Sequence, residues 1–343
     1  MTSVRVLCGL CLVLVLVATS AGSVGDFHEV PSVENECRSP SQDIPFSRAV
    51  SVPASDAAVN ATVKRVNESA VRITYHDLES DERNFGPSLP TWVYELGIRV
   101  ASADGFDVQR SQIATTLVWN SSVRTPSVTF ITERQPNSEF EDIGAAIQSE
   151  WAFLPVPPHT HPTNVSVAAG QPGFVGEQVL LLGDYELYSR QVGCHEIQLY
   201  VPTALDTAEP PSAIVESMEA AARELRVGWR YETVRIFGVG SPIRVGGRAF
   251  THEAWVHVNS TFRPRQTSGV WYPPQPTLAN AWLHEYAHTR QRWVTNASVS
   301  SNAQWLTEAV PTYYMISETE RHPASRTRAI PTAVRVPTPL NYR

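Results

Sequence analysis

Two histidines and a glutamate lie close together in the segment Trp282–Gln291, which reads W-L-H-E-Y-A-H-T-R-Q. His284 and His288 are four residues apart, and a helix of 3.6 residues per turn brings such positions to one face. Two imidazole rings on one face can ligate a single zinc ion. Glu285 is turned by ~100° from His284 around the helix. Its carboxylate should therefore lie beside the metal, where it could take a proton from a water molecule that the metal activates.

A catalytic zinc site has a third protein ligand and keeps one position for water. Glu308 is the best candidate for that ligand, in the segment Gln304–Tyr314 that reads Q-W-L-T-E-A-V-P-T-Y-Y. The stretch Asn296–Asn302 is rich in serine and asparagine and should form a loop, after which a second helix returns antiparallel with Glu308. Thr277, which follows Pro276, is expected to cap the first helix.

Five other histidines have weaker signals. His159 and His161 lie among prolines, so a loop is expected there rather than a metal site. His195 is expected to be an ordinary strand residue. His252 and His257 fall on the strand before the motif helix, where either could line the cleft, although a surface or core position is the simpler expectation.

The motif H-E-x-x-H followed by W-L-x-E-x-x-x-x-Y-Y resembles the gluzincin metallopeptidases, the thermolysin-like and aminopeptidase-like enzymes that include the glycyl aminopeptidase family. The close resemblance covers residues 276–314, is weaker from Gly173 onward, and is only architectural in the N-terminal part. It implies an α+β catalytic domain with two active-site helices, a zinc cofactor, and hydrolysis of a peptide or protein substrate. It also implies the roles given above to the two histidines and the two glutamates.

The sequence departs from the gluzincin pattern at three places. Ala309 follows the third candidate ligand, where aminopeptidase-like members usually have glycine. Pro311 lies inside the expected second helix, where an interior proline costs about 3 kcal/mol. No G-x-M-E-N-type strand is recognisable that would bind a substrate amino terminus; the segment Gly247–Trp255 occupies its place, and Glu253 is a weak substitute. Aminopeptidase and endopeptidase activity therefore both stay open.

Short runs of β-branched and aromatic residues, separated by turn residues, follow one another from Ala58 onward. They predict an antiparallel β-sandwich domain over residues 58–172. A helix is expected over Glu139–Glu150, and the proline-rich stretch Leu154–Pro162 looks like a domain junction. The strands expected in this part are Ala70–Tyr75, Trp92–Val100 and Ser127–Ile131.

A mixed order of strands and helices over residues 173–320 predicts the α+β catalytic domain. An amphipathic helix is expected over Pro211–Val227, because its apolar residues recur at helical spacing. The residues of that apolar stripe are Ile214, Met218, Ala221 and Leu225. The expected strands are Val179–Tyr188, Glu196–Val201, Thr233–Val239 and Ala249–Val258.

The first residues have the composition of a signal peptide. Arg5 is followed by the apolar run Val6–Ala18 and by small residues, which predicts a signal over residues 1–22 and a linker or loosely ordered arm over 23–57. The apolar run is shorter than the ~20 residues of a transmembrane helix, although an uncleaved anchor stays open. We therefore expect a secreted or cell-surface protein with no further membrane span. The formal net charge of −7 argues against a nucleic-acid partner.

Export would bring the chain into a compartment where disulfides form. Cys37 and Cys194 are then a candidate pair, and only a structure can show whether their Cα atoms come within bridging distance. Sequons of the N-x-S/T type would also be accessible to glycosylation on an exported surface. The sequons begin at Asn60, Asn67, Asn120, Asn164, Asn259 and Asn296.

The tail over residues 321–343 contains arginines and prolines but no acidic residue. It is either a disordered basic tail or a truncated or frame-shifted C-terminus, and in the second case catalysis would be impaired although the metal site is encoded. Two other functions therefore stay open. The chain could be a catalytically impaired, zinc-binding surface glycoprotein derived from a peptidase, or a β-sandwich envelope or adhesion protein without a metal.

Overall fold

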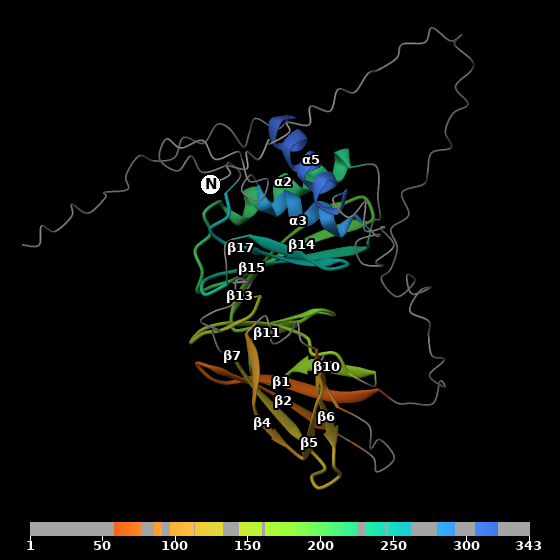
Figure 1. The fold of residues 1–343 in the computed structure, drawn as a ribbon. Coiled ribbons are helices and arrows are strands. Elements are labelled where there is room, and N and C mark those ends of the chain that lie inside the picture. Colours follow the sequence, from red (N-terminus) through yellow and green to blue (C-terminus); the bar gives the residue numbers. More distant parts are fainter. Residues whose placement is uncertain are drawn as a thin grey trace, which may run out of the picture. The chain divides into compact units, whose positions relative to one another are not determined.

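The computed structural model describes residues 58–76, 78, 86–90, 97–112, 114–132, 144–159, 162–225, 231–243, 246–261, 280–291 and 306–321. Most regular elements in these ranges are strands, which form four sheets, and helices are few (Figure 1). The expected signal peptide, the arm over residues 23–57 and the tail beyond residue 321 lie outside the described residues.

The first sheet has five strands in the order β10-β1-β2-β7-β4. Its strands are β1 (Val59–Asn67), β2 (Ala70–His76), β4 (Ile98–Asp104), β7 (Ser127–Thr132) and β10 (Thr163–Val167). A three-stranded sheet in the order β3-β6-β5 accompanies it, with β3 (Ser88–Pro90), β5 (Phe106–Arg110) and β6 (Ala114–Trp119). Along β1, Val59, Ala61 and Val63 are buried, as expected for a strand with one face on a core.

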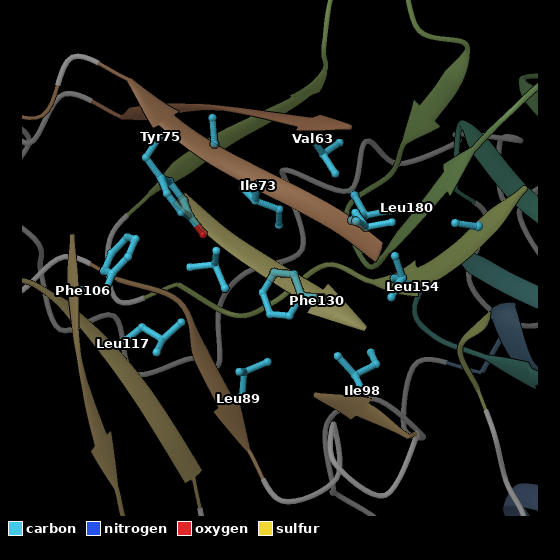
Figure 2. Close-up of a cluster of buried hydrophobic side chains, with 14 of the residues drawn as sticks. Val63, Ile73, Tyr75, Leu89, Ile98, Phe106, Leu117, Phe130, Leu154 and Leu180 are labelled. Atoms are coloured by element: carbon cyan, nitrogen blue, oxygen red, sulfur yellow. The ribbon is translucent and has the colours of Figure 1, made fainter. Parts of the chain in front are cut away.

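A third sheet has four strands in the order β11-β12-β9-β8. They are β8 (Ala146–Ile147), β9 (Ala152–Pro155), β11 (Gly173–Val175) and β12 (Val179–Leu182). Leu180 of β12 packs with side chains of the first two sheets, among them Ile73 and Leu117, in the core that Figure 2 shows. Leu181 packs in a different cluster with Phe237. Both faces of β12 are thus covered, which is why its sequence V-L-L-L has no polar alternation.

One sequence expectation fails in this region. The helix expected over Glu139–Glu150 is not found in its described part, where β8 instead forms a hairpin with β9. The backbone N–H of Gln148 donates to the Trp151 carbonyl in the turn of that hairpin. In addition, β12 pairs with β9, so strand pairing runs across the boundary that was expected between residues 172 and 173.

The fourth sheet has the order β13-β14-β15-β17-β16, with β14, β15 and β17 parallel and both edge strands antiparallel. Its strands are β13 (Tyr185–Val192), β14 (His195–Pro202), β15 (Thr233–Val239), β16 (Gly247–Ala249) and β17 (Glu253–His257). The single strand expected over Val179–Tyr188 is divided at Gly183, whose φ of +109° breaks the extended chain. The strand expected over Ala249–Val258 is likewise two strands, joined by a turn in which the Phe250 N–H donates to the Glu253 carbonyl.

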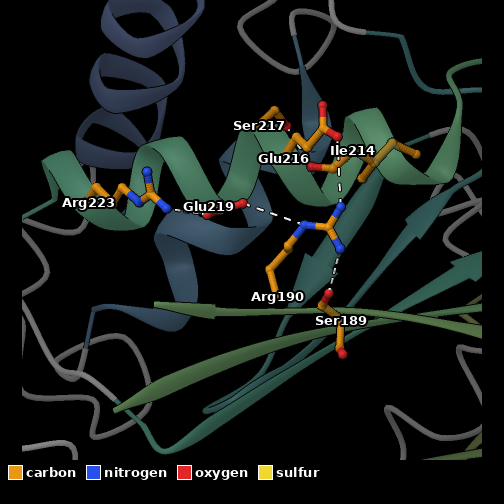
Figure 3. A network of polar contacts seen from close by, with 7 residues as sticks. All are labelled: Ser189, Arg190, Ile214, Glu216, Ser217, Glu219 and Arg223. Carbon is orange, nitrogen blue, oxygen red and sulfur yellow. Dashed lines mark hydrogen bonds and ion pairs between the residues drawn. The ribbon is translucent and has the colours of Figure 1, made fainter. Parts of the chain in front are cut away.

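Helix α2 (Pro211–Glu224) covers part of this sheet and confirms the predicted amphipathic stripe, since all four apolar residues of the stripe are buried. The proline at its first position lacks an N–H that the helix would leave unbonded in any case. On the solvent side, Arg190 of β13 lies 3.8 Å from Glu216 and 3.6 Å from Glu219 of α2, and Arg223 also reaches Glu219 (Figure 3). Exposed ion pairs of this kind contribute roughly 0–1 kcal/mol each, so the buried stripe is the main attachment.

Helix α3 (Ala281–Thr289) contains the H-E-x-x-H motif and is buried along its whole length. Its N-cap is Asn280, whose side chain accepts the Leu283 N–H; Thr277, the expected cap, lies outside the described residues. Helix α5 (Leu306–Arg321) packs against α3 and continues through Pro311. No described helix is long and apolar enough to cross a membrane.

Candidate metal centre

Three nitrogen and oxygen atoms from α3 and α5 converge on one point. The Nε2 atoms of His284 and His288 are 3.1 Å apart. Oε2 of Glu308 lies 3.2 Å from Nε2 of His284 and 3.4 Å from Nε2 of His288. Within the described ranges this is the one group of three or more such side chains whose donor atoms lie close enough together to share an ion.

The size of this triangle fits zinc. With metal–ligand distances of about 2.0–2.1 Å and tetrahedral angles, neighbouring ligand atoms lie about 3.3 Å apart. The three measured separations of 3.1, 3.2 and 3.4 Å are close to that edge length. Two imidazoles and one carboxylate are also a donor set that zinc accepts in catalytic sites. The His284, His288 and Glu308 side chains could therefore hold a zinc ion and leave a fourth position open.

A second layer of contacts orients one of the rings. Nδ1 of His288 lies 3.1 Å from Oε1 of Gln291, so the ring nitrogen that faces away from the triangle can donate to a side-chain amide oxygen. A contact of this kind leaves Nε2 as the free lone pair for a metal. Gln291 is buried just beyond the end of α3, and its residue type and spacing alone do not predict this contact.

The charges of the triangle favour an ionised carboxylate. Hydrogen bonds from His284 and His288 hold the pKa of Glu308 well below its usual range. Burial by itself lowers the pKa of His288, but the hydrogen bond and charge of Glu308, together with the charge of Glu285, leave that pKa raised. A carboxylate that attracts protons onto neighbouring imidazoles would attract a metal cation in the same way, and the two compete.

Glu285 lies on the same helix but outside the triangle. Its side chain is almost completely buried, and burial raises its pKa to about 8. Hydrogen bonding from the Ala249 backbone, in β16, works against this rise in the pKa. A Cβ atom placed on Gly247 would lie 2.8 Å from Oε1 of Glu285, so the side chain rests directly on this edge strand. Glu285 thus lies beside the three candidate ligands, and its role as a general base stays a prediction.

Glu253, the weak substitute for a substrate-binding residue, faces away from α3. Ala249 pairs with Ala254, and both side chains lie on the face of the sheet that packs with α3. Glu253 is the next residue of its strand, so its side chain points to the opposite face. Its carboxylate is fully buried and accepts the backbone N–H groups of Glu177 (2.9 Å) and Gln178 (2.8 Å).

The described histidines with weaker signals are not part of the candidate metal centre. His252 and His257 are both buried, which lowers their pKa values, and Nε2 of His252 lies 3.5 Å from Oε1 of Glu177. The ring of His159 is hydrogen-bonded to a tyrosine of β2, and burial lowers its pKa to about 4. His161 lies outside the described residues.

His195 has a more specific place than the sequence indicated. Its Nδ1 bonds to the carbonyl oxygen of Tyr231, which can only accept, so Nδ1 carries a hydrogen. In the neutral ring Nε2 is then an acceptor, and it lies 3.1 Å from the Tyr286 hydroxyl of α3. Arg290 in turn donates to the Tyr286 oxygen at 3.3 Å and to the Leu225 carbonyl at 3.0 Å. This chain of hydrogen bonds attaches the metal-site helix to β14 and to the end of α2.

Two predictions related to export can be followed in the structure. Cys194 is disulfide-bonded, while its expected partner Cys37 lies outside the described residues. Glycosylation requires an exposed acceptor asparagine. The asparagines of five sequons are exposed, and Asn296 lies outside the described residues. The exposed ones are Asn60, Asn67, Asn120, Asn164 and Asn259.

Comparison with known proteins finds no matching family model and no matching curated sequence. Among solved structures, the chain is similar to an aminopeptidase N family protein from Idiomarina loihiensis, with 11% identity, a TM-score of 0.43, and coverage of 68% of this chain and 47% of that one. It is also similar to native yeast LTA4 hydrolase, with 11% identity, a TM-score of 0.32, and coverage of 78% and 50%. The chain thus spans about half the length of these proteins. We therefore base the function on the geometry of the site, and the assignment to a thermolysin-type domain stays a prediction.

Proposed function

We propose that this protein is a zinc-dependent peptidase. The observation that carries the proposal is the triangle of His284, His288 and Glu308 with Glu285 beside it on α3. Its dimensions suit a tetrahedral zinc ion, and the neighbouring carboxylate is placed to handle a proton. The substrate is a peptide or a protein, and both exopeptidase and endopeptidase modes are compatible with the site.

A zinc ion held by the three ligands would polarise the scissile carbonyl and lower the pKa of the attacking water. Glu285 would accept a proton from the attacking water and would return that proton to the leaving amine when the C–N bond breaks. In the metal-free protein its pKa of about 8 already lies close to neutral pH. A nearby cation lowers the pKa of a carboxyl group, which favours the ionised form needed to accept the proton.

The test combines metal analysis with hydrolysis. Protein loaded with zinc and dialysed should retain about one zinc per chain, as expected for a three-ligand site, and should cleave a mixture of free and N-acetylated peptides. The N-acetylated members report whether a free amino terminus is required. One bound zinc without hydrolysis would instead indicate the zinc-binding glycoprotein, and no bound zinc would refute the proposed centre.

We further propose that the protein acts outside the cytoplasm. The disulfide at Cys194 and the exposed sequon asparagines support this location, because disulfides persist in oxidising compartments. The N-terminal signal expected from the sequence agrees with it. Cell fractionation tests the proposal, and recovery of the protein only in the cytoplasm would refute it.

A further inference from the structure

Only some of the backbone N–H and C=O groups of the edge strand β16 and its flanking residues face the neighbouring strand β17. The His257 N–H donates to the Gly246 carbonyl, and the Phe250 N–H donates to the Glu253 carbonyl. In an antiparallel ladder, hydrogen-bonded pairs alternate with pairs that are not hydrogen-bonded. Gly247 and Ala249 occupy the alternate positions, so their N–H and C=O groups point to the open edge of the sheet. Hydrogen bonding from the Ala249 backbone lowers the pKa of Glu285, which agrees with an N–H that points to this open edge.

The backbone of Gly247 does not itself require glycine. Its φ is not in the left-handed region, where side chains are disfavoured. The obstacle to a side chain is Glu285: a Cβ on residue 247 would lie 2.8 Å from its Oε1, 2.9 Å from its Cδ and closer still to its Cγ. Real Cβ atoms essentially never approach heavy atoms this closely.

From these contacts we infer that Gly247 is a positioning residue for Glu285. Because residue 247 has no side chain, the Glu285 side chain can lie directly against β16. A methyl group at this position would overlap the Glu285 side chain and displace its carboxylate. Glu285 is 6% exposed, so its neighbours leave it little room to move elsewhere. The inference rests on the proposed function, which makes Glu285 the general base.

Gly247→Ala tests whether Gly247 affects catalysis through the position of Glu285. Misplacing a reacting group by about 1 Å can cost about 100-fold in rate, so kcat should fall by ten- to 100-fold. Bound zinc should stay at the wild-type level, because the three heavy atoms nearest to a Cβ on residue 247 all belong to Glu285 and none to a candidate ligand. Gly238→Ala is the matched control: Gly238 lies in β15 of the same sheet, has no positive φ, and its Cβ would lie 3.2 Å from Cγ1 of Val258. The control should lower thermal stability while leaving kcat within about twofold of wild type.

A double-mutant cycle tests the contact between residue 247 and Glu285 without an activity assay. Gly247→Ala should lower the melting temperature by several degrees in the wild-type background, on the scale expected for overpacking in a domain of this size. In a Glu285→Ala background the obstacle is gone, so most of that loss should disappear. Gly238→Ala should lower the melting temperature equally in both backgrounds.

The inference is overturned if Gly247→Ala lowers the melting temperature equally in the wild-type and Glu285→Ala backgrounds. It is also overturned if Gly247→Ala leaves kcat of an active enzyme unchanged. Loss of zinc in Gly247→Ala would also overturn it, since the residue would then act on the ligands rather than on Glu285. If the wild-type protein binds zinc but cleaves no peptide, the proposed function fails. The melting temperatures of the cycle still decide whether Gly247 sets the position of the Glu285 side chain.

Discussion

Replacing Glu285 with glutamine should stabilise the metal-free protein at alkaline pH. Burial raises the pKa of Glu285 from 4.5 to about 8. Below pH 4.5 the carboxyl group is protonated in both the folded and the unfolded chain, so its ionisation does not lower the free energy of unfolding. As the pH rises, the unfolded chain releases this proton before the folded chain does, and the free energy of unfolding falls until the pH passes about 8. Glutamine is neutral throughout and escapes this loss.

The size of the effect follows from the two pKa values. One pKa unit corresponds to about 1.36 kcal/mol, so a change from 4.5 to about 8 sets an upper limit of roughly 5 kcal/mol above pH 8. A domain of 150–250 residues changes its melting temperature by about 2–4 °C per kcal/mol. The glutamine variant should therefore gain on the order of 10 °C over wild type between pH 5 and pH 9. In the zinc-loaded protein the cation favours the carboxylate, and the gain should shrink.

The assay is thermal unfolding of both proteins in a chelator at pH 5 and pH 9. The same substitution at Glu216, on the exposed side of α2, is the control and should show no comparable pH-dependent gain. With zinc bound, Glu285→Gln should retain the metal and lose ~10²-fold or more in hydrolysis, the scale of general-base catalysis. A stability difference that is the same at both pH values would refute the buried position of Glu285. Full activity in the variant would refute its role as the base.

Three further predictions concern the ligands, Glu253 and export. His284→Ala and Glu308→Gln should each lose zinc on dialysis; loss of an outer hydrogen-bonding partner already costs 10–100-fold in affinity, so loss of a ligand should exceed ~100-fold. Wild-type zinc should also dissociate as the pH falls through the range in which histidines protonate, about pH 6.5 and below. A full zinc content in both variants would disprove the ligand set. Glu253→Gln should destabilise the protein by ~1–3 kcal/mol in urea unfolding, because its carboxylate satisfies two backbone N–H groups. The zinc content and KM of this variant should stay near wild type. A large rise in KM would instead indicate that Glu253 binds substrate. Mass analysis of the native protein should find its N-terminus between Ala21 and Val24 and sugar on at least one sequon; an intact Met1 would contradict cleavage of a signal.

The features that the sequence predicted well are those that depend on the local periodicity of the chain. Helix α3 brings His284 and His288 to one face because 3.6 residues per turn do so in any helix. The apolar stripe of α2 and the bounds of β15 follow from period and composition in the same way. Glu308 was also identified correctly as a neighbour of the histidines, but on the evidence of residue type and a plausible loop rather than of geometry.

Local periodicity failed where a short segment takes its conformation from distant partners. The segment around Ala146 has helix-compatible residues, yet it forms a strand because β9 is available to pair with it. Both faces of β12 are buried, and Gly183 ends the strand where the chain must leave the sheet. Pairing and burial by remote parts of the chain decided these conformations, and they outweigh intrinsic preference.

Only the tertiary structure decided which side chains meet around Glu285. A one-residue difference in strand position sends a side chain to the other face of a sheet, and this places Glu253 away from α3 while Gly247 lies against Glu285. The bond from Tyr286 to His195 joins segments that are far apart in the sequence. The spacing of residues along one helix is set by backbone geometry, whereas the contacts between this helix and an edge strand depend on how the sheets and helices pack.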